Sequence, residues 1–132
     1  MPIRFIIIDN DPVNNLLCTL TIKEIAGDVE IKTFNLPVKG FEYIAAEYLN
    51  TENITFLLLD INMPGWSGWD FLDHFEKLDD KIMRQIKIYL LSSSIDANDK
   101  HRAKENKNVV GYIEKPLSEK NVFAMLEQKW TL

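Results

Sequence analysis

The chain has 132 residues, of which 46% are hydrophobic and 27% are charged, and its formal net charge at pH 7 is -5. This length fits one domain with a core of its own, and the acidic balance argues against nucleic acid as the main partner. The single cysteine, Cys18, excludes a disulfide framework and argues against a metal-thiolate site. Because Cys18 stands among leucines, we expect it to be a small core residue.

The first residues, MPIRFIIIDND, have neither the long apolar region nor the cleavage site of a signal peptide. No run reaches the ~18 apolar residues that a membrane helix needs. We therefore expect a cytoplasmic protein without membrane insertion, folded as one domain over residues 1–132.

Short apolar runs alternate with longer amphipathic stretches along the chain. Because such runs are typical of strands in a sheet that is covered on both faces, five strands are expected, at residues 5–8, 29–34, 54–59, 86–91 and 109–113.

Helices are expected between these strands. The first has Asp11 as a candidate N-cap and Pro12 in its first turn, and helical spacing predicts a buried stripe of Val13, Leu16, Leu17 and Leu20. Three further stripes are Phe41, Ile44, Ala45 and Tyr48; Phe71, Leu72, Phe75 and Leu78; and Val122, Leu126 and Trp130, in a helix that begins at Ser118. Residues 96–106 form a polar stretch with few apolar anchors, which predicts a weakly held helix.

Five strands that alternate with five helices indicate βαβ units, and therefore an α/β fold with a parallel sheet. In such a sheet, ligands bind beyond the carboxyl ends of the strands. The polar residues that follow the strands are therefore the candidate site.

Four strands end in groups that suit a metal ion and a phosphate. The first is followed by Asp9-Asn10-Asp11, the third by Asp60, the fourth by Ser92-Ser93-Ser94, and the fifth leads to Lys115-Pro116. Carboxylate and amide oxygens are ligands for Mg²⁺, and a carboxylate can form an aspartyl phosphate. A hydroxyl and an ammonium group can bind the oxygens of the transferred group. Each residue alone is typical of a loop, and the four together, in this order, indicate a site.

Four sequence runs resemble the response regulator receiver domains of two-component signalling, a family that includes the chemotaxis-Y-like proteins. FIIIDNDPVNN is similar to the first strand and its acidic cluster, and LLLDINMPGWSG to the acceptor strand and its loop. IYLLSSS and GYIEKP are similar to the strands that carry the switch hydroxyl, the switch aromatic residue and the lysine-proline pair. The resemblance covers nearly the whole chain. It implies a doubly wound, flavodoxin-like sheet with strand order 2-1-3-4-5 and no separate output domain.

The resemblance also assigns roles to single residues. It implies that Asp60 is the phospho-acceptor and that Lys115 and Ser92 bind the phosphoryl group, with Ser92 and Tyr112 as switch residues. It implies a Mg²⁺ site formed by Asp9, by Asn10, by Asp60 and by the backbone carbonyl of Asn62. A cis peptide bond is expected at Lys115-Pro116.

Asn10 departs from the family, which usually has aspartate there. The amide keeps an oxygen ligand but lacks a negative charge, so a weakened Mg²⁺ site is expected, and Asp11 is not expected to occupy the same place. Trp66 and Trp69, in or beside the acceptor loop, are a milder departure, and at least one of them is expected to be partly exposed.

The resemblance implies a self-phosphorylating switch rather than a turnover enzyme. Its donor would be a sensor histidine kinase or a histidine phosphotransfer protein, and its downstream protein target is unknown. One alternative is a pseudo-receiver that binds partners without phosphorylation, which Asn10 favours. A second is a haloacid-dehalogenase-like phosphohydrolase that uses Asp9 and Asp11, although it leaves Asp60 unexplained. A flavin-binding flavodoxin is opposed by the absence of a hydroxyl- and glycine-rich loop after the first strand.

Overall fold

Five strands and six helices alternate along the chain in a computed structural model that describes residues 3–47, 53–94 and 96–128. The strands are β1 (Ile3–Ile8), β2 (Glu30–Phe34), β3 (Ile54–Asp60), β4 (Ile86–Ser92) and β5 (Val109–Glu114). The helices are α1 (Pro12–Ala26), α2 (Pro37–Glu47), α3 (Gly68–Phe75), α4 (Asp80–Gln85), α5 (Ala97–Glu105) and α6 (Glu119–Leu126).

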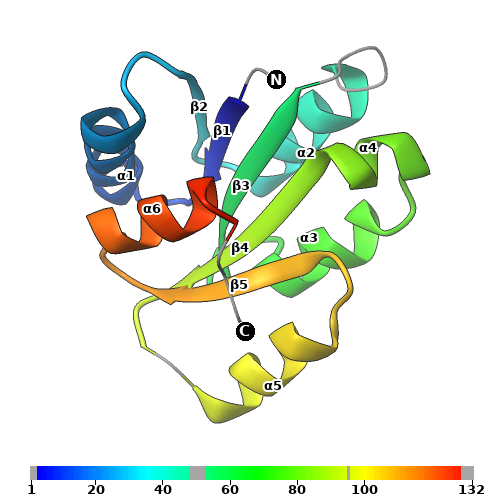
Figure 1. Ribbon diagram of the computed structural model, residues 1–132. Helices are drawn as coiled ribbons and strands as arrows, with labels where there is room; N and C mark the ends of the chain where they lie inside the picture. Colours follow the sequence, from blue (N-terminus) through cyan, green and yellow to red (C-terminus); the bar gives the residue numbers. More distant parts are fainter. Residues whose placement is uncertain (1–2, 48–52, 95, 129–132) are drawn as a thin grey trace.

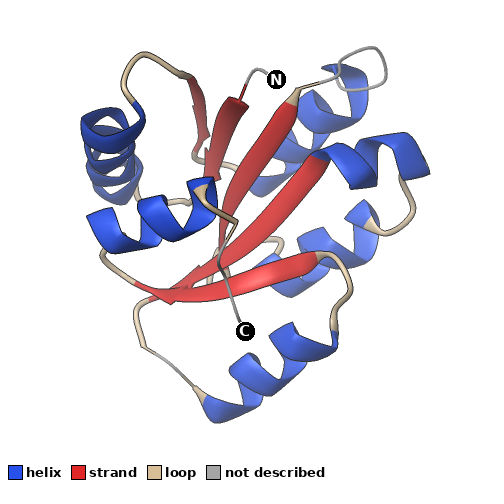
Figure 2. Cartoon of the chain, viewed as in Figure 1, coloured by secondary structure: helices blue, strands red, loops and turns tan. Residues whose placement is uncertain are grey.

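The strands form one parallel sheet in the order β2-β1-β3-β4-β5, as the resemblance implied. Helices α1 and α6 cover one face of the sheet, and α2, α3, α4 and α5 lie on the other side (Figures 1 and 2). The strand order reverses between β1 and β3, so their carboxyl ends lie side by side at the position where α/β sheets of this kind bind ligands.

Alternate residues of the central strands fill two separate cores, because successive side chains of a strand point to opposite faces. Ile6, Ile8, Leu57 and Leu59 pack under α2 and α3, whereas Phe5, Ile7, Phe56 and Leu58 pack under α1 and α6. All eight are at most 2% exposed. The apolar runs of the sequence therefore predicted these strands correctly.

The expected number of helices was wrong, since α4 is a sixth helix between α3 and β4. It has only six residues, capped by Asp79, whose side chain accepts a hydrogen bond from Lys81 N. Ile82 is its one buried residue, so the segment shows no helical period. Leu78, expected in the third helix, lies beyond the end of α3 but still packs against the core. Tyr48 and Trp130 lie outside the described residues.

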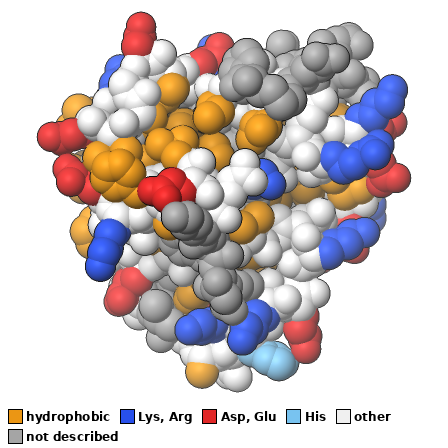
Figure 3. Space-filling view, viewed as in Figure 1, with side chains coloured by type: hydrophobic (Ala, Val, Ile, Leu, Met, Phe, Trp, Pro, Cys, Tyr) orange, Lys and Arg blue, Asp and Glu red, His pale blue; other side chains and the backbone are white. Residues whose placement is uncertain are grey.

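The predicted buried face of α1 was also wrong. Its predicted apolar stripe is 48–61% exposed, at Val13, Leu16, Leu17 and Leu20. The inward face consists instead of Asn14, Asn15, Cys18 and Ile22, so that only Cys18 was placed correctly. Figure 3 shows hydrophobic side chains on the surface of the part of the molecule where α1 and α6 lie. The asparagines face inward because their amides bond to groups at the end of β1.

The caps of the helices explain where several of them begin. Asp11 accepts a hydrogen bond from Val13 N at the start of α1, as the sequence predicted, and Pro12 is the first helical residue. Ser67 and Ser118 form capping boxes at α3 and α6. Along the part of the chain that the structure describes, no helix combines the length and hydropathy needed to cross a bilayer.

The reversed face of α1 leads to a stability prediction. Leu16→Gln should change the free energy of unfolding by no more than about 0.5 kcal/mol, because its side chain is already exposed. Ile22→Ala should cost about 2–5 kcal/mol, because it empties a fully buried position. Urea unfolding of both variants measures the difference. A larger loss for Leu16→Gln than for Ile22→Ala would contradict this orientation of the helix.

Candidate functional site

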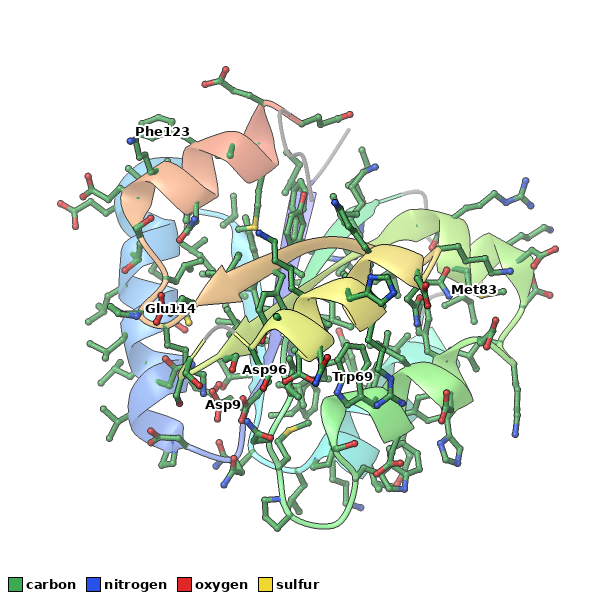
Figure 4. All side chains as sticks on the ribbon, turned by 90° about the horizontal axis from the view of Figure 1, so that it is seen from below. Asp9, Trp69, Met83, Asp96, Glu114 and Phe123 are labelled. Carbon is green, nitrogen blue, oxygen red and sulfur yellow. The ribbon has the colours of Figure 1, made fainter. Side chains whose placement is uncertain are left out.

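The ends of four strands bring together the residues that the sequence selected. Asp9 follows β1, Asp60 ends β3, Ser92 ends β4 and Lys115 follows β5. The Lys115 ammonium lies 2.8 Å from Asp9 Oδ2 and 3.3 Å from Asp60 Oδ1, so one cation joins three strand ends. Figure 4 looks at this end of the sheet and labels Asp9 there. The expected cis peptide bond at Lys115-Pro116 is present.

Burial sets the electrostatics of the two carboxylates. Asp9 is 0% exposed and Asp60 is 2% exposed. Burial and the nearby charge of Asp9 raise the pKa of Asp60 to about 6, although Lys115 and the Asn62 backbone act to lower it. Burial acts to lower the pKa of Lys115, but its hydrogen bonds and charge interactions with the two carboxylates raise it. Lys115 therefore stays protonated, whereas the charged form of Asp60 is disfavoured, first by burial and then by the charge of Asp9.

Asp9 is held by several donors from α1 and its N-terminal turn. Its Oδ1 accepts from Asp11 N at 2.9 Å, and its Oδ2 accepts from Asn14 Nδ2 at 2.7 Å. Its backbone carbonyl accepts from Asn15 Nδ2 at 3.0 Å, and the same amide donates to Asn35 Oδ1 at 2.9 Å. Asn15 thus ties the end of β1 to the residue that follows β2.

Two glycines shape the loop that carries Asp60. Gly65 has a φ of +80°, a backbone conformation that side chains rarely adopt. Gly68 begins α3 and donates its N–H to Ile61 O at 2.8 Å. A Cβ at Gly68 would lie 2.8 Å from the backbone oxygen of Asp60 and 2.9 Å from Ile61 Cα. The start of α3 can therefore approach the end of β3 only because residue 68 is glycine.

Ser92 and Tyr112 share one acceptor in this conformation. Ser92 Oγ donates to the Ser94 carbonyl at 2.6 Å, and the Tyr112 hydroxyl approaches the same oxygen at 3.5 Å. Both side chains are buried, at 3% and 7% exposure. The two predicted switch residues are therefore neighbours through the Ser94 backbone.

The acidic residues suit a hard divalent cation. Lys115 contacts both Asp9 and Asp60, which shows that the two carboxylates face one point, so two negative charges meet a single ammonium there. Asn10 and Asn62 are exposed at the adjoining turns, and Asn62 N lies 3.4 Å from Asp60 Oδ1. No group of three or more His, Cys, Asp or Glu side chains within the described ranges is arranged to hold a metal. A cation here would therefore depend on two carboxylates with amide, carbonyl and water oxygens.

The Asp11 side chain has a different role from those of Asp9 and Asp60. Its side chain caps α1 through Val13 N and is exposed. From the sequence we expected that Asp11 would not occupy the same place as Asn10. The same geometry opposes a phosphohydrolase that needs Asp9 and Asp11 to converge on one substrate.

The two tryptophans are packed and partly exposed. Trp66 stacks on His74 with ring centroids 4.0 Å apart, and its edge meets Phe41. Trp69, labelled in Figure 4, lies in the first turn of α3. The Arg102 guanidinium of α5 lies over the Trp69 ring, 4.4 Å from the ring centroid. Partial exposure was expected for at least one of them.

Sequence reasoning missed Asn14, Asn15 and the close contact at Gly68. The asparagines follow an acidic strand end, where buried amides have carboxylate and carbonyl oxygens to bond, and this was an available signal. Gly68 was part of the quoted loop motif, but the approach to the Asp60 backbone could be seen only in three dimensions.

Comparison with known proteins agrees with this geometry. Residues 5–127 match the family described as the response regulator receiver domain. A two-component response regulator from Cytophaga hutchinsonii superimposes with a TM-score of 0.89 at 26% identity, covering 96% of each chain. A receiver protein from Dyadobacter fermentans has a TM-score of 0.86 at 21% identity, again over 96% of each chain, and supports the fold.

Two curated relatives are longer than this chain. The phosphate regulon transcriptional regulatory protein PhoB of Escherichia coli is 29% identical over 115 residues, which are 82% of this chain and 49% of PhoB. The sensor protein GacS of Pseudomonas syringae is 26% identical over 129 residues, which are 97% of this chain and 13% of GacS. The chain thus spans half or less of the length of these relatives.

The raised pKa of Asp60 predicts that its charge destabilises the fold. Because the folded pKa of about 6 lies above 3.8, the ordinary value for aspartate, stability falls as pH rises through this interval. Above pH 6, without divalent metal, Asp60→Asn should raise the free energy of unfolding by about 1–3 kcal/mol, and the gain should vanish below pH 4. Urea unfolding in EDTA tests this, with exposed Asp73→Asn as the control. Equal stability of the wild type and Asp60→Asn at pH 8 would contradict it.

Proposed function

The chain belongs to the response regulator receiver family, and on this premise we propose that Asp60 accepts a phosphoryl group from a phosphohistidine donor. The donor would be a sensor histidine kinase or a histidine phosphotransfer protein. The observation that carries the proposal is the Lys115 ammonium between the buried carboxylates of Asp9 and Asp60. In this arrangement the Asp60 carboxylate, the proposed nucleophile, lies beside the positive charge of Lys115.

In the proposed transfer, an Asp60 carboxylate oxygen attacks phosphorus and the bond from phosphorus to the donor imidazole nitrogen breaks. Lys115 would bind an oxygen of the incoming group, because its ammonium already lies 3.3 Å from Asp60 Oδ1. Asp9, Asn10, Asp60 and the Asn62 carbonyl would hold Mg²⁺, which would reduce the repulsion between the anionic donor and Asp60. The packed contact at Gly68 would keep the acceptor backbone fixed.

The switch would begin with the Ser92 hydroxyl. To donate to a phosphoryl oxygen, Ser92 must give up its bond to the Ser94 carbonyl. Tyr112 approaches the same carbonyl, so movement of the 92–94 segment would reach β5 and α5. This fits the ordinary action of an added phosphoryl charge, which creates new charge-assisted hydrogen bonds.

The signal would leave by protein contact through the face formed by α5, β5 and α6. Of the residues of α5, only Ala103 is buried, so this helix has few anchors to resist a shift. The downstream partner would be a protein that recognises this face, and we place the domain in the cytoplasm.

Acetyl phosphate and Mg²⁺ should add one phosphoryl group to the wild type and none to Asp60→Asn, as measured by intact mass. The exposed neighbour Asp73→Asn is the matched control and should label like the wild type. Labelling that persists in Asp60→Asn would refute the assignment. No labelling of the folded wild type would favour a non-phosphorylated pseudo-receiver.

Asn10→Asp should tighten Mg²⁺ binding, because a carboxylate adds one negative charge beside the cation. After desolvation we expect a gain of about 1–2 kcal/mol, or about 5- to 30-fold in affinity. Tryptophan fluorescence can follow the titration, since Trp66 and Trp69 lie in or beside the acceptor loop. Asn98→Asp adds the same charge at the start of α5 and should not change the affinity. Equal affinity of Asn10→Asp and the wild type would remove Asn10 from the metal site.

A further inference from the structure

Asn14 lies on the inward face of α1, where the sequence predicted no functional residue. Its side chain is buried at 7% exposure, and its amide nitrogen lies 2.7 Å from Asp9 Oδ2. The same nitrogen is 3.7 Å from Cys18 Sγ, a much weaker acceptor. Asn14 and Lys115 line one open cavity of about 300 Å³. Asn14 therefore bonds to the Asp9 carboxylate and also borders an open cavity beside Lys115.

The hydrogen bonds of Asp9 leave little of its carboxylate free. A carboxylate offers about four lone-pair positions. Oδ2 uses two of them for Asn14 and Lys115, and Oδ1 uses one for Asp11 N. One position on Oδ1 remains for a cation or for a water molecule bound to it. Asn14 and Lys115 thus occupy Oδ2 together and leave the free position on Oδ1.

Asn15 shows that this role is not general for amides on α1. Its amide is buried in the same turn, yet it donates to the Asp9 backbone, to Asn35 Oδ1 and, at 3.4 Å, to Phe34 O. It fastens strand ends together and makes no bond to the carboxylate. Asn14 alone of these two neighbours fixes the Asp9 side chain.

We propose that Asn14 is a positioning residue of the acceptor site, which holds the Asp9 carboxylate with Oδ1 presented to the cation. The inference rests on the proposed function, because it assumes that a divalent cation binds beside Asp60. A neutral amide suits this role, since it donates a hydrogen bond without adding charge. Partners that orient a ligand side chain typically change metal affinity by 10- to 100-fold when they are removed.

Asn14→Leu tests the inference, because it keeps a side chain of similar size but removes the donor. We expect Mg²⁺ affinity, followed by tryptophan fluorescence, to fall about 10-fold. The rate of labelling by acetyl phosphate at saturating Mg²⁺ should stay near that of the wild type, since Asp60 and Lys115 are unchanged. Cys18→Ala is the matched control, because it removes buried volume from the same face and leaves every hydrogen bond of Asp9 in place.

Asn14→Asp provides a second test if Asn14→Leu does not fold. It keeps the shape of the side chain but sets a carboxylate against Asp9, so a bound cation should become more important for the fold. Mg²⁺ should then raise its melting temperature by more than that of the wild type.

The outcomes separate the inference from the proposed function. Mg²⁺ affinity that is unchanged in folded Asn14→Leu, or that falls equally in Cys18→Ala, would overturn the role of Asn14 while the wild type still labels. An Asn14→Asp protein with no larger response to Mg²⁺ would also overturn it. A wild type that neither binds Mg²⁺ nor labels would overturn the proposed function, and the inference with it.

Discussion

The ammonium group of Lys115 between Asp9 and Asp60 is the interaction on which the site depends. It joins the ends of β1 and β3 to the residue that follows β5, and it supplies one positive charge for two buried carboxylates. Burying two such charges without a cation would be very costly. One ammonium faces two carboxylates, which leaves a shortage of positive charge, and the pKa of Asp60 is raised first by burial and then by the charge of Asp9. The same shortage of positive charge suits the site to a further cation.

Satisfying Asp9 also decides how α1 packs. Asn14 and Asn15 must face the end of β1 to donate to its carboxylate and carbonyl, and Cys18 and Ile22 follow them on the same side. The leucines of the opposite side then remain exposed. The two amides donate to a carboxylate and a carbonyl that the fold buries, which the leucines of the opposite side could not do. Hydrogen bonding to Asp9, and not the spacing of the apolar residues, therefore set which face of α1 turns inward.

This balance explains how much could be predicted from the sequence. The strands were predictable because short continuous apolar runs are typical of strands buried on both faces. The site was predictable because parallel strands end at one edge of the sheet, which brings together Asp9, Asp60, Ser92 and Lys115. The buried face of α1 could not be predicted from hydrophobicity, since its partners are oxygens at the site. The short helix α4 has too few residues for a period, and the contact between Gly68 and the Asp60 backbone depends on packing between distant segments.

Helix α5 is held by few buried residues, in contrast to the fully buried central strands. Gly68 touches the Asp60 backbone, and Trp69, the next residue of α3, holds the Arg102 guanidinium of α5 against its ring. Such a contact at an exposed site is worth about 0.5–1 kcal/mol, which is small enough for a shift of the acceptor loop to break. The Ser94 carbonyl, bonded to Ser92, lies two residues before Asp96, the N-cap of the same helix. Two connections from the strand ends thus lead to a helix with a single buried residue, Ala103, and a helix with more buried anchors would have less freedom to shift.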